Sequence, residues 1–410
     1  MASHALDVLR ERGFIAQTVY EDDLYKMMEE GPVTFYVGFD PTADSLHIGH
    51  FIPIMAMMHM QRAGHRPIAL LGGGTAMVGD PSGKTSMRPM LDRTLLERNA
   101  EGLQKQLSRF LDFSEGKAIL ANNADWLLQL NYVDFLREIG AHFSVNRMLT
   151  AEAYKQRLER GLTFLEFNYM LMQSYDFLEL FRRYGCRVQL GGDDQWSNIL
   201  SGADLIRRKE QEAAFAVTFR LLLTSTGEKM GKTVGGALWL DRDRTSPYDF
   251  YQYWRNIDDA DVENCLAMLT FLPMDEVRRL GALRGSEINE AKKVLAFELT
   301  KIVHSKDDAA AAQAAAEALF GGAENGADAP ATELSREGLA ENKRVIDLMV
   351  LCGLCKSRGE GRRLVQGGGV YVNGEALADP DGEVSEDDFG AEGLLLRKGK
   401  KVYHRLVLKG

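Results

Sequence analysis

The chain has 410 residues, 45% of them hydrophobic and 26% charged, which is ordinary for globular proteins and excludes a wholly disordered, collagen-like or coiled-coil chain. At roughly 100 to 200 residues per domain, this length predicts several domains. The 49 Lys and Arg against 59 Asp and Glu give a formal charge of −10 at pH 7, which argues against indiscriminate nucleic-acid binding but allows local basic patches.

The sequence predicts a cytoplasmic protein that does not enter a membrane. The longest uncharged stretch, residues 45–61, is interrupted by histidines and a proline and is too short and polar to cross a bilayer. Charged residues at 7 and 10–12 lie where a signal peptide would have its apolar core. Cys352 and Cys355 lack the second ligand pair that a structural zinc site needs, so no protein-bound metal is expected.

Short apolar runs alternate with longer helical patterns from Val33 to about Phe219, which predicts an α/β fold with a parallel sheet flanked by helices. Ligands of such sheets bind at the carboxyl ends of the strands, so the loops after Phe39, Leu71 and Leu190 are candidate functional sites. The predicted strands cover residues 33–39, 67–71, 117–121, 187–190 and 213–219.

Two further domains are expected after the first, which we place at residues 1–240. Residues 241–330 show several amphipathic helices that end in a Gly- and Ala-rich connection at 321–330, which predicts an α-helical domain. Residues 343–410 predict a small α+β domain in which two helices precede a hairpin at 369–374, where an Asn-Gly pair favours a tight turn.

Two histidines follow the first predicted strand. His47 and His50 are three residues apart, so they share one face of the first turn of a helix. The N–H groups at a helix N-terminus attract anions, and Gly49 leaves room for a ligand, so a nucleotide could bind there. Two histidines alone would more often be a solvated helix end.

A glycine-containing segment far downstream, residues 227–233, carries Lys229 and Lys232. Lysines on a loop can close around a phosphoryl group on which negative charge builds up, although a basic surface turn is the commoner explanation of such a short motif. Residues 79–85 resemble a P-loop but are one residue short, because Val78 stands where the motif needs glycine. A P-loop phosphotransferase is therefore the weakest alternative.

Together, these segments resemble the HIGH and KMSKS motifs of class I aminoacyl-tRNA synthetases. His47-Ile-Gly-His50 is a full match, and in Lys229-Met-Gly-Lys-Thr233 glycine replaces the first serine and threonine the last. The resemblance implies a Rossmann-like catalytic domain. It also implies that the transferring phosphoryl group and the leaving pyrophosphate are stabilised by His47, His50, Lys229, Lys232 and Thr233.

A polar helix face indicates the amino acid that such an enzyme would bind. Tyr169, Gln173 and Asp176 are spaced by four and three residues and share one face, although a helix that shows its polar side to water is the alternative. With Tyr36, Asp80 and Gln195 in their motifs, this set resembles the bacterial tyrosyl-tRNA synthetases.

That resemblance covers residues 36–233 and resumes at the C-terminus. It implies that Tyr36 and Asp176 hold the phenolic hydroxyl of L-tyrosine. Asp80, Tyr169 and Gln173 would hold its ammonium group, and Gln195 would lie near its carboxylate. The ATP pocket would be lined by Gly38, Asp40, Thr42, His47, Gly49, His50, Gly192, Asp194 and Lys232.

The implied reaction forms tyrosyl-adenylate and pyrophosphate from L-tyrosine and ATP, and then transfers the tyrosyl group to the 3′ end of tRNA(Tyr). Mg²⁺ would accompany ATP, bound largely by phosphates and water. The family likeness also suggests a homodimer, with the segment before Tyr169 contributing to the interface.

The last predicted domain carries local basic clusters in an acidic chain. Residues 343–410 hold 12 Lys or Arg and 10 Asp or Glu, with eight of the acids at 375–392 and six of the bases at 397–409. Residues 356–374 resemble an S4 RNA-binding domain. The basic residues Lys356, Arg358, Arg362 and Arg363 are therefore candidate RNA contacts, and a solvated basic helix is the alternative.

Two other functions remain open at this point. A non-catalytic RNA-binding protein could keep an inactive synthetase fold, although both motif histidines and both lysines are present. A sister enzyme that charges tryptophan would share the class I framework, although Tyr36 with Asp176 suits a phenol better than an indole.

Overall fold

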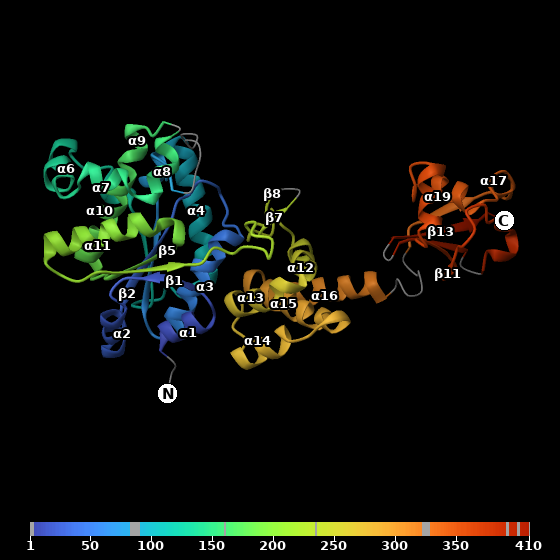
Figure 1. Cartoon of the computed structure of the whole chain (residues 1–410), viewed down its shortest axis with the longest axis horizontal. Helices are drawn as coiled ribbons and strands as arrows, with labels where there is room; N and C mark the ends of the chain where they lie inside the picture. The colour runs from blue at the N-terminus through green and yellow to red at the C-terminus, as the bar shows by residue number, and fades with distance from the viewer. Residues whose placement is uncertain are drawn as a thin grey trace. The chain divides into compact units, whose positions relative to one another are not determined.

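The computed structural model describes residues 4–82, 91–159, 161–233, 236–321, 329–390, 393–399 and 402–409, with the backbone alone described at 152, 153, 156, 232, 233 and 319–321. The chain divides into two compact units, residues 1–309 and 310–410 (Figure 1). No helix among the described residues is long and apolar enough to cross a membrane. The predicted connection at 321–330 lies mostly outside the described residues.

The first unit is built on a six-stranded sheet with the order β1-β6-β5-β2-β3-β4. Strands β2 to β6 pair in parallel, and β1 pairs with β6 in the antiparallel direction. The five predicted strands are confirmed, whereas β1 was not predicted. The strands are β1 (Ile15–Thr18), β2 (Thr34–Phe39), β3 (Arg66–Leu71), β4 (Ile119–Asn122), β5 (Val188–Gly192) and β6 (Phe215–Phe219).

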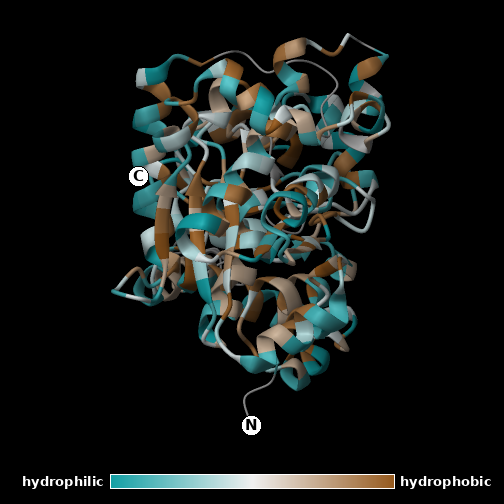
Figure 2. Ribbon diagram, turned by 90° about the vertical axis from the view of Figure 1, so that its left-hand side faces the viewer, coloured by the Kyte–Doolittle hydropathy of each residue, from teal (hydrophilic) through white to brown (hydrophobic). Residues whose placement is uncertain are grey.

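Helices cover both faces of this sheet, which explains why its strands read as nearly continuous apolar runs (Figures 1 and 2). One face carries Tyr36 and Ile68 and packs against Phe177 of α10 and Ile206 of α11. Side chains alternate along a strand, so Phe35 lies on the opposite face. The helices around the sheet include α3 (Ile48–Arg62), α4 (Arg93–Phe110), α10 (Tyr169–Tyr184) and α11 (Trp196–Glu210).

Shorter elements complete the part of the unit around the sheet. They are α1 (Ala5–Glu11), α2 (Glu21–Glu30), α5 (Ala124–Leu127), α6 (Tyr132–Glu138), α7 (Val145–Leu149), α8 (Glu152–Leu158), α9 (Phe164–Phe167), β7 (Lys232–Thr233) and β8 (Gly236–Ala237).

The expected amphipathic helices follow the sheet, and most of them pack within the first unit. They are α12 (Pro247–Arg255), α13 (Val262–Leu269), α14 (Met274–Gly281), α15 (Ile288–Val303) and α16 (Lys306–Gly321). The buried Arg12, in the turn after α1, donates hydrogen bonds to the carbonyl groups of Ala267, Thr270 and Leu272 at the end of α13. This contact joins the N-terminal segment to the helical one.

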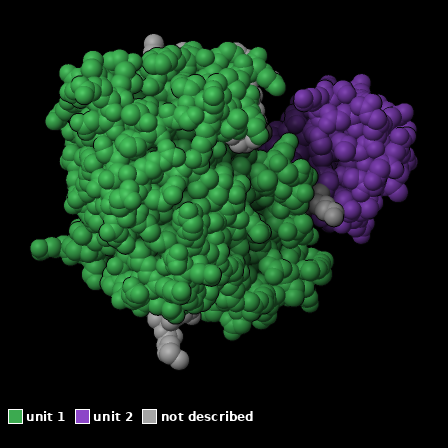
Figure 3. Space-filling model, turned by 60° about the vertical axis from the view of Figure 1, so that its left-hand side comes forward, with its two compact units in different colours: residues 1–309 green, residues 310–410 purple. Residues whose placement is uncertain are grey.

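The second unit, which is purple in Figure 3, contains a five-stranded sheet with the order β11-β10-β12-β13-β9 and its own apolar core. The predicted hairpin is confirmed, because β10 pairs with β11 across Asn373 and Gly374, which both have positive φ. The sheet also includes β9, which precedes residue 343. Its elements are β9 (Ala331–Leu334), α17 (Arg336–Glu341), α18 (Val345–Leu351), α19 (Arg358–Gln366), β10 (Val370–Val372), β11 (Glu375–Ala376), β12 (Leu394–Lys398) and β13 (Val402–Leu408).

Candidate functional site

A cavity of about 800 Å³ opens at the carboxyl ends of β2 and β5. These two strands are neighbours, but the chain leaves β2 toward β3 and leaves β5 toward β6, so the cavity lies at the switch point where α/β sheets bind ligands. Every residue predicted for the tyrosine, ATP and catalytic sites lines this cavity, except Lys232 and Thr233. The side chains of those two residues lie outside the described part of the chain.

One end of the cavity holds a buried phenol and a buried carboxylate. Tyr36 is 1% exposed, and its hydroxyl oxygen has no hydrogen-bond partner among the described residues. Asp176 is 2% exposed and accepts hydrogen bonds from Asn123 Nδ2 at 2.9 Å and Trp126 Nε1 at 2.7 Å. Burial raises the pKa of Asp176 to about 8 despite those two bonds. An unpartnered hydroxyl beside a carboxylate suits a ligand that brings its own hydroxyl group.

Sequence reasoning missed three polar residues here. Asn123 and Trp126 come directly after β4, so their position at a strand's carboxyl end was the available signal. Gln189 lies opposite Tyr36 in the pairing of β5 with β2, and its Oε1 atom is buried without a partner among the described residues. A polar residue inside a buried strand was the signal for Gln189.

A hydrogen-bonded carboxylate lies further along the cavity. Asp80 accepts hydrogen bonds from Gln195 Nε2 at 2.6 Å and from the N–H group of Ser82 at 2.9 Å. Gln173, also predicted for the tyrosine site, has a buried Oε1 without a partner in the described structure. Asp80 belongs to the segment that resembles a P-loop, and residues 83–85 of that segment lie outside the described residues.

Tyr169 links the two predicted pockets. Its hydroxyl donates a hydrogen bond to Asp40 Oδ2 at 3.0 Å, and Thr75 Oγ1 donates to Asp40 Oδ1 at 2.8 Å. Burial, followed by the charges of Asp40 and Asp80, raises the pKa of Tyr169 well above its ordinary value. The phenol is therefore a neutral donor that fixes the Asp40 carboxylate at the cavity wall.

The two histidines organise the first turn of α3. His47 caps the helix by accepting the Gly49 N–H group at its Nδ1 atom (3.0 Å), and His50 Nδ1 accepts the N–H group of His47 (3.2 Å). A neutral imidazole that accepts at Nδ1 carries its proton on Nε2. Both rings therefore carry their proton on Nε2, and they lie at a helix N-terminus, where anions are attracted.

The lysine-bearing segment lies against the same turn of α3. The N–H group of Met230 donates to the Leu222 carbonyl at 2.9 Å, and Gly231 accepts from the N–H group of Leu238 at 2.8 Å. Gly231 has a φ of +87°, and a Cβ atom there would lie 1.9 Å from Ile48 Cγ2. This contact explains the glycine that replaces serine in the motif, and it brings the two motifs together.

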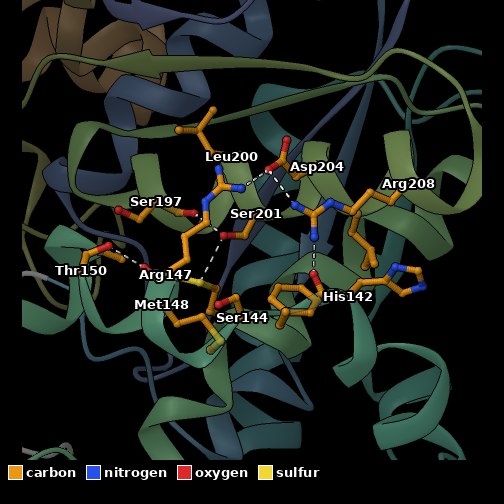
Figure 4. A pocket seen from close by; sticks show the side chains of 14 residues that line it. His142, Ser144, Arg147, Met148, Thr150, Ser197, Leu200, Ser201, Asp204 and Arg208 are labelled. Atoms are coloured by element: carbon orange, nitrogen blue, oxygen red, sulfur yellow. Dashed lines mark hydrogen bonds and ion pairs between the residues drawn. The ribbon is translucent and has the colours of Figure 1, made fainter.

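A second cavity of about 200 Å³ lies among α7, α10 and α11 (Figure 4). Its basic residues are compensated within the chain, because Arg147 and Arg208 both pair with Asp204. No predicted site residue lines it. Across all described residues, no group of three or more His, Cys, Asp or Glu could hold a metal ion.

The candidate RNA contacts lie on α19 or just before it in the second unit. Arg358 pairs with Asp347 at 2.6 Å, and Arg362 pairs with Asp381. Lys356 and Arg363 are exposed. Two of these four side chains therefore have an acidic partner inside the unit.

Two protein families match this chain. Residues 28–321 match the family described as tRNA synthetases class I (W and Y), and residues 323–406 match the Tyrosine--tRNA ligase SYY-like C-terminal domain. The chain is 59% identical over 409 residues to the tyrosine--tRNA ligase of Clostridium tetani, with 100% of each chain covered. It is 61% identical over 404 residues to that of Caldanaerobacter subterraneus subsp. tengcongensis, which covers 98% of this chain and 99% of the relative.

Solved structures are also similar to this chain. A C-terminally truncated mitochondrial tyrosyl-tRNA synthetase of Aspergillus nidulans matches with a TM-score of 0.70 at 30% identity, covering 78% of this chain and 95% of that one. A tryptophanyl-tRNA synthetase of Encephalitozoon cuniculi shares the fold with a TM-score of 0.57 at 13% identity, covering 75% and 87% of the two chains.

Proposed function

This chain belongs to the class I tRNA synthetases, among the tyrosine–tRNA ligases, and we propose that its large cavity is where L-tyrosine is activated with ATP for transfer to tRNA(Tyr). In the first step an oxygen of the tyrosine carboxylate bonds to the α-phosphorus of ATP, and pyrophosphate leaves with the electrons of the broken P–O bond. In the second step a ribose hydroxyl of the 3′-terminal adenosine attacks the tyrosyl carbonyl and loses its proton, and AMP leaves.

The observation that carries this proposal is the unpartnered hydroxyl of Tyr36 in the same cavity as the buried Asp176 carboxyl group. A phenolic hydroxyl entering there would give the Tyr36 hydroxyl a partner and would add a hydrogen bond to Asp176, whereas phenylalanine would leave the Tyr36 hydroxyl unpartnered. A site that must hydrogen-bond a hydroxyl rejects the analogue that lacks it, a rule for which tyrosyl-tRNA synthetases are the standard example. We therefore expect no separate editing activity.

Positioning and charge stabilisation would supply most of the catalysis. The attacking carboxylate is already ionised at pH 7, so no general base is needed. The Nε2–H groups of His47 and His50, together with Lys229, Lys232 and Thr233, are proposed to stabilise the phosphoryl group and the leaving pyrophosphate. Mg²⁺ is proposed to be held mainly by the phosphates and water.

The amino-acid substrate can be tested by tyrosine-dependent ATP–pyrophosphate exchange, with tyrosine, phenylalanine and tryptophan compared at equal concentration. We expect exchange with tyrosine and little with the other two. Exchange with tryptophan alone, or with none of the three, would overturn the proposal.

A homodimer is proposed from apolar side chains that the first unit leaves exposed. The exposed residues are Tyr132, Val133, Phe164 and Leu165. Phe135 of α6 and Phe167 of α9, which neighbour them in the sequence, both pack against one apolar cluster, and this brings the two helices together. In analytical ultracentrifugation, the wild type should sediment as a dimer and Phe164→Glu as a monomer. Val402→Glu, at an exposed site in the second unit, should sediment as the wild type does. A Phe164→Glu chain that sediments as the wild type does would contradict this interface.

The second unit is proposed to contact the tRNA through Lys356, Arg358, Arg362 and Arg363 as an S4-like domain. The match of residues 323–406 to the C-terminal domain of tyrosine--tRNA ligases supports this role. The ion pairs of Arg358 and Arg362 with Asp347 and Asp381 would orient the two arginine side chains until tRNA phosphates bind them.

A cytoplasmic location stays a prediction.

A further inference from the structure

The side chain of Tyr253 on α12 contacts the lysine-bearing segment, residues 227–233, but does not line the large cavity. Its hydroxyl oxygen accepts a hydrogen bond from the backbone N–H group of Gly231 at 2.8 Å. Gly231 lies between Lys229 and Lys232, so this bond holds the backbone that carries both lysines.

The ring of Tyr253 is itself held in place. It packs edge-on against Trp254, with ring centroids 5.1 Å apart, and Trp254 is fully buried. Burial raises the pKa of the Tyr253 hydroxyl, so the group stays neutral at any ordinary pH. A fixed and neutral acceptor is suited to orienting one particular N–H group.

A second contact joins the same segment to the helical region. The side chain of Met230 is buried, and Cys265 Sγ on α13 lies 3.6 Å from Met230 Sδ. On its other side, the segment contacts Ile48 of α3 through Gly231. The backbone between the two lysines is thus held between the first turn of α3 and the helices α12 and α13.

We propose that Tyr253 is a positioning residue for the activation step, which holds Lys229 and Lys232 where pyrophosphate leaves. This inference rests on the proposed function. Tyr253 acts only through the Gly231 N–H group, so its loss should affect the step in which the lysines are used and leave the tyrosine pocket unchanged.

The matched pair Tyr253→Phe and Tyr248→Phe tests this role in the full-length protein. Both residues lie on α12, and each exchange removes one phenolic oxygen, but the Tyr248 oxygen accepts from Gln252 on the same helix. The measurements are the single-turnover rate of tyrosyl-adenylate formation, the affinity of the adenylate complex for pyrophosphate, and the dissociation constant of tyrosine.

Tyr253→Phe should lower the rate of adenylate formation or the affinity for pyrophosphate by about five- to tenfold, the worth of one ordinary hydrogen bond. The dissociation constant of tyrosine should stay at its wild-type value, and Tyr248→Phe should change none of these quantities.

The proposal is overturned if Tyr253→Phe forms adenylate and binds pyrophosphate as the wild type does. It is also overturned if tyrosine binding weakens in proportion, because the residue would then support the whole pocket. A wild-type protein that forms no adenylate from tyrosine would instead contradict the proposed function.

Discussion

Asp176 is a buried carboxyl group that lines the large cavity. Its pKa rises from 3.8 to about 8 in the folded protein, mainly because burial disfavours the charged form. Folding therefore favours the protonated group. The stabilisation is fully present below pH 3.8, and it is lost as the pH rises through the folded-state value near 8.

Asp176→Asn should remove this pH dependence. In the ligand-free wild type, we expect Asp176 to lower the free energy of unfolding by up to about 1.4 kcal/mol per pH unit between pH 5 and 8. Urea unfolding at several pH values would measure both slopes. Equal slopes for the wild type and Asp176→Asn would contradict an uncharged Asp176 in the empty pocket.

Substitution of Gly231 tests whether the close contact between the lysine-bearing segment and α3 matters for adenylate formation. Gly231→Ala places a methyl group against Ile48, and the same change at Gly227 requires similar strain at positive φ (+83°) but meets no atom within 4 Å. We expect Gly231→Ala to slow adenylate formation by about tenfold or more relative to Gly227→Ala. Single-turnover kinetics would decide this, and equal rates would show that the contact with α3 does not matter.

Much of the site could be predicted from the sequence because its residues lie in short local motifs. Tyr36 lies within β2, His47 and Asp80 lie in the segments that follow β2 and β3, and Asp176 shares a helix face with Tyr169, so local spacing was enough. The partners of Asp176 depend on how β4 and α10 pack, which no local pattern shows. The same holds for the hydrogen bond between Tyr169 and Asp40.

At the scale of elements, Arg12 is the main polar link between the N-terminal segment and α13. Its guanidinium group is buried, which lowers its pKa, and it donates to three carbonyl groups that would otherwise lack partners at a helix end. Arg10, two residues earlier, makes exposed ion pairs with Asp7 and Glu21.

Arg12→Met should therefore lower the free energy of unfolding by about 2–4 kcal/mol, and Arg10→Met by less than about 1 kcal/mol. Urea denaturation of the two variants provides the comparison. Similar losses for both would mean that the carbonyl groups find water or other donors when Arg12 is removed.

Two of the strands that were not predicted show the limit of local patterns. β1 has only four residues and lies at an edge of the sheet, where its pairing with β6 fixes its conformation. β9 is equally short and pairs in parallel with β13, which is formed by the end of the chain. Pairing with partners so distant in the sequence makes these segments strands. The segments of β2 and β3, in contrast, are longer apolar runs that can be predicted as strands without their partners.

At the scale of the whole molecule, the chain separates activation of the amino acid from part of the proposed tRNA recognition. All described residues of the large cavity belong to the first unit, and the candidate RNA contacts belong to the second. The negative net charge thus averages over units for which different partners are proposed, which is why it did not exclude a nucleic acid.

A chain that ends at Gly321, the last residue of α16, should keep tyrosine-dependent ATP–pyrophosphate exchange. Charging of tRNA should fall by about tenfold or more, because the basic contacts of the second unit are lost. The solved relative from Aspergillus nidulans is itself C-terminally truncated. Unchanged charging would contradict a role for residues 329–409.

The pairing of β2 with β5 has a consequence for how this protein is made. Tyr36 and Gln189 are neighbours in the sheet but lie far apart in the chain, and β6 completes the sheet only at Phe219. In a chain still growing on the ribosome, the proposed tyrosine pocket therefore cannot be complete until more than half of the 410 residues have emerged. That stretch itself contains tyrosines, so each new copy can form its pocket only with tyrosine that earlier copies have attached to tRNA.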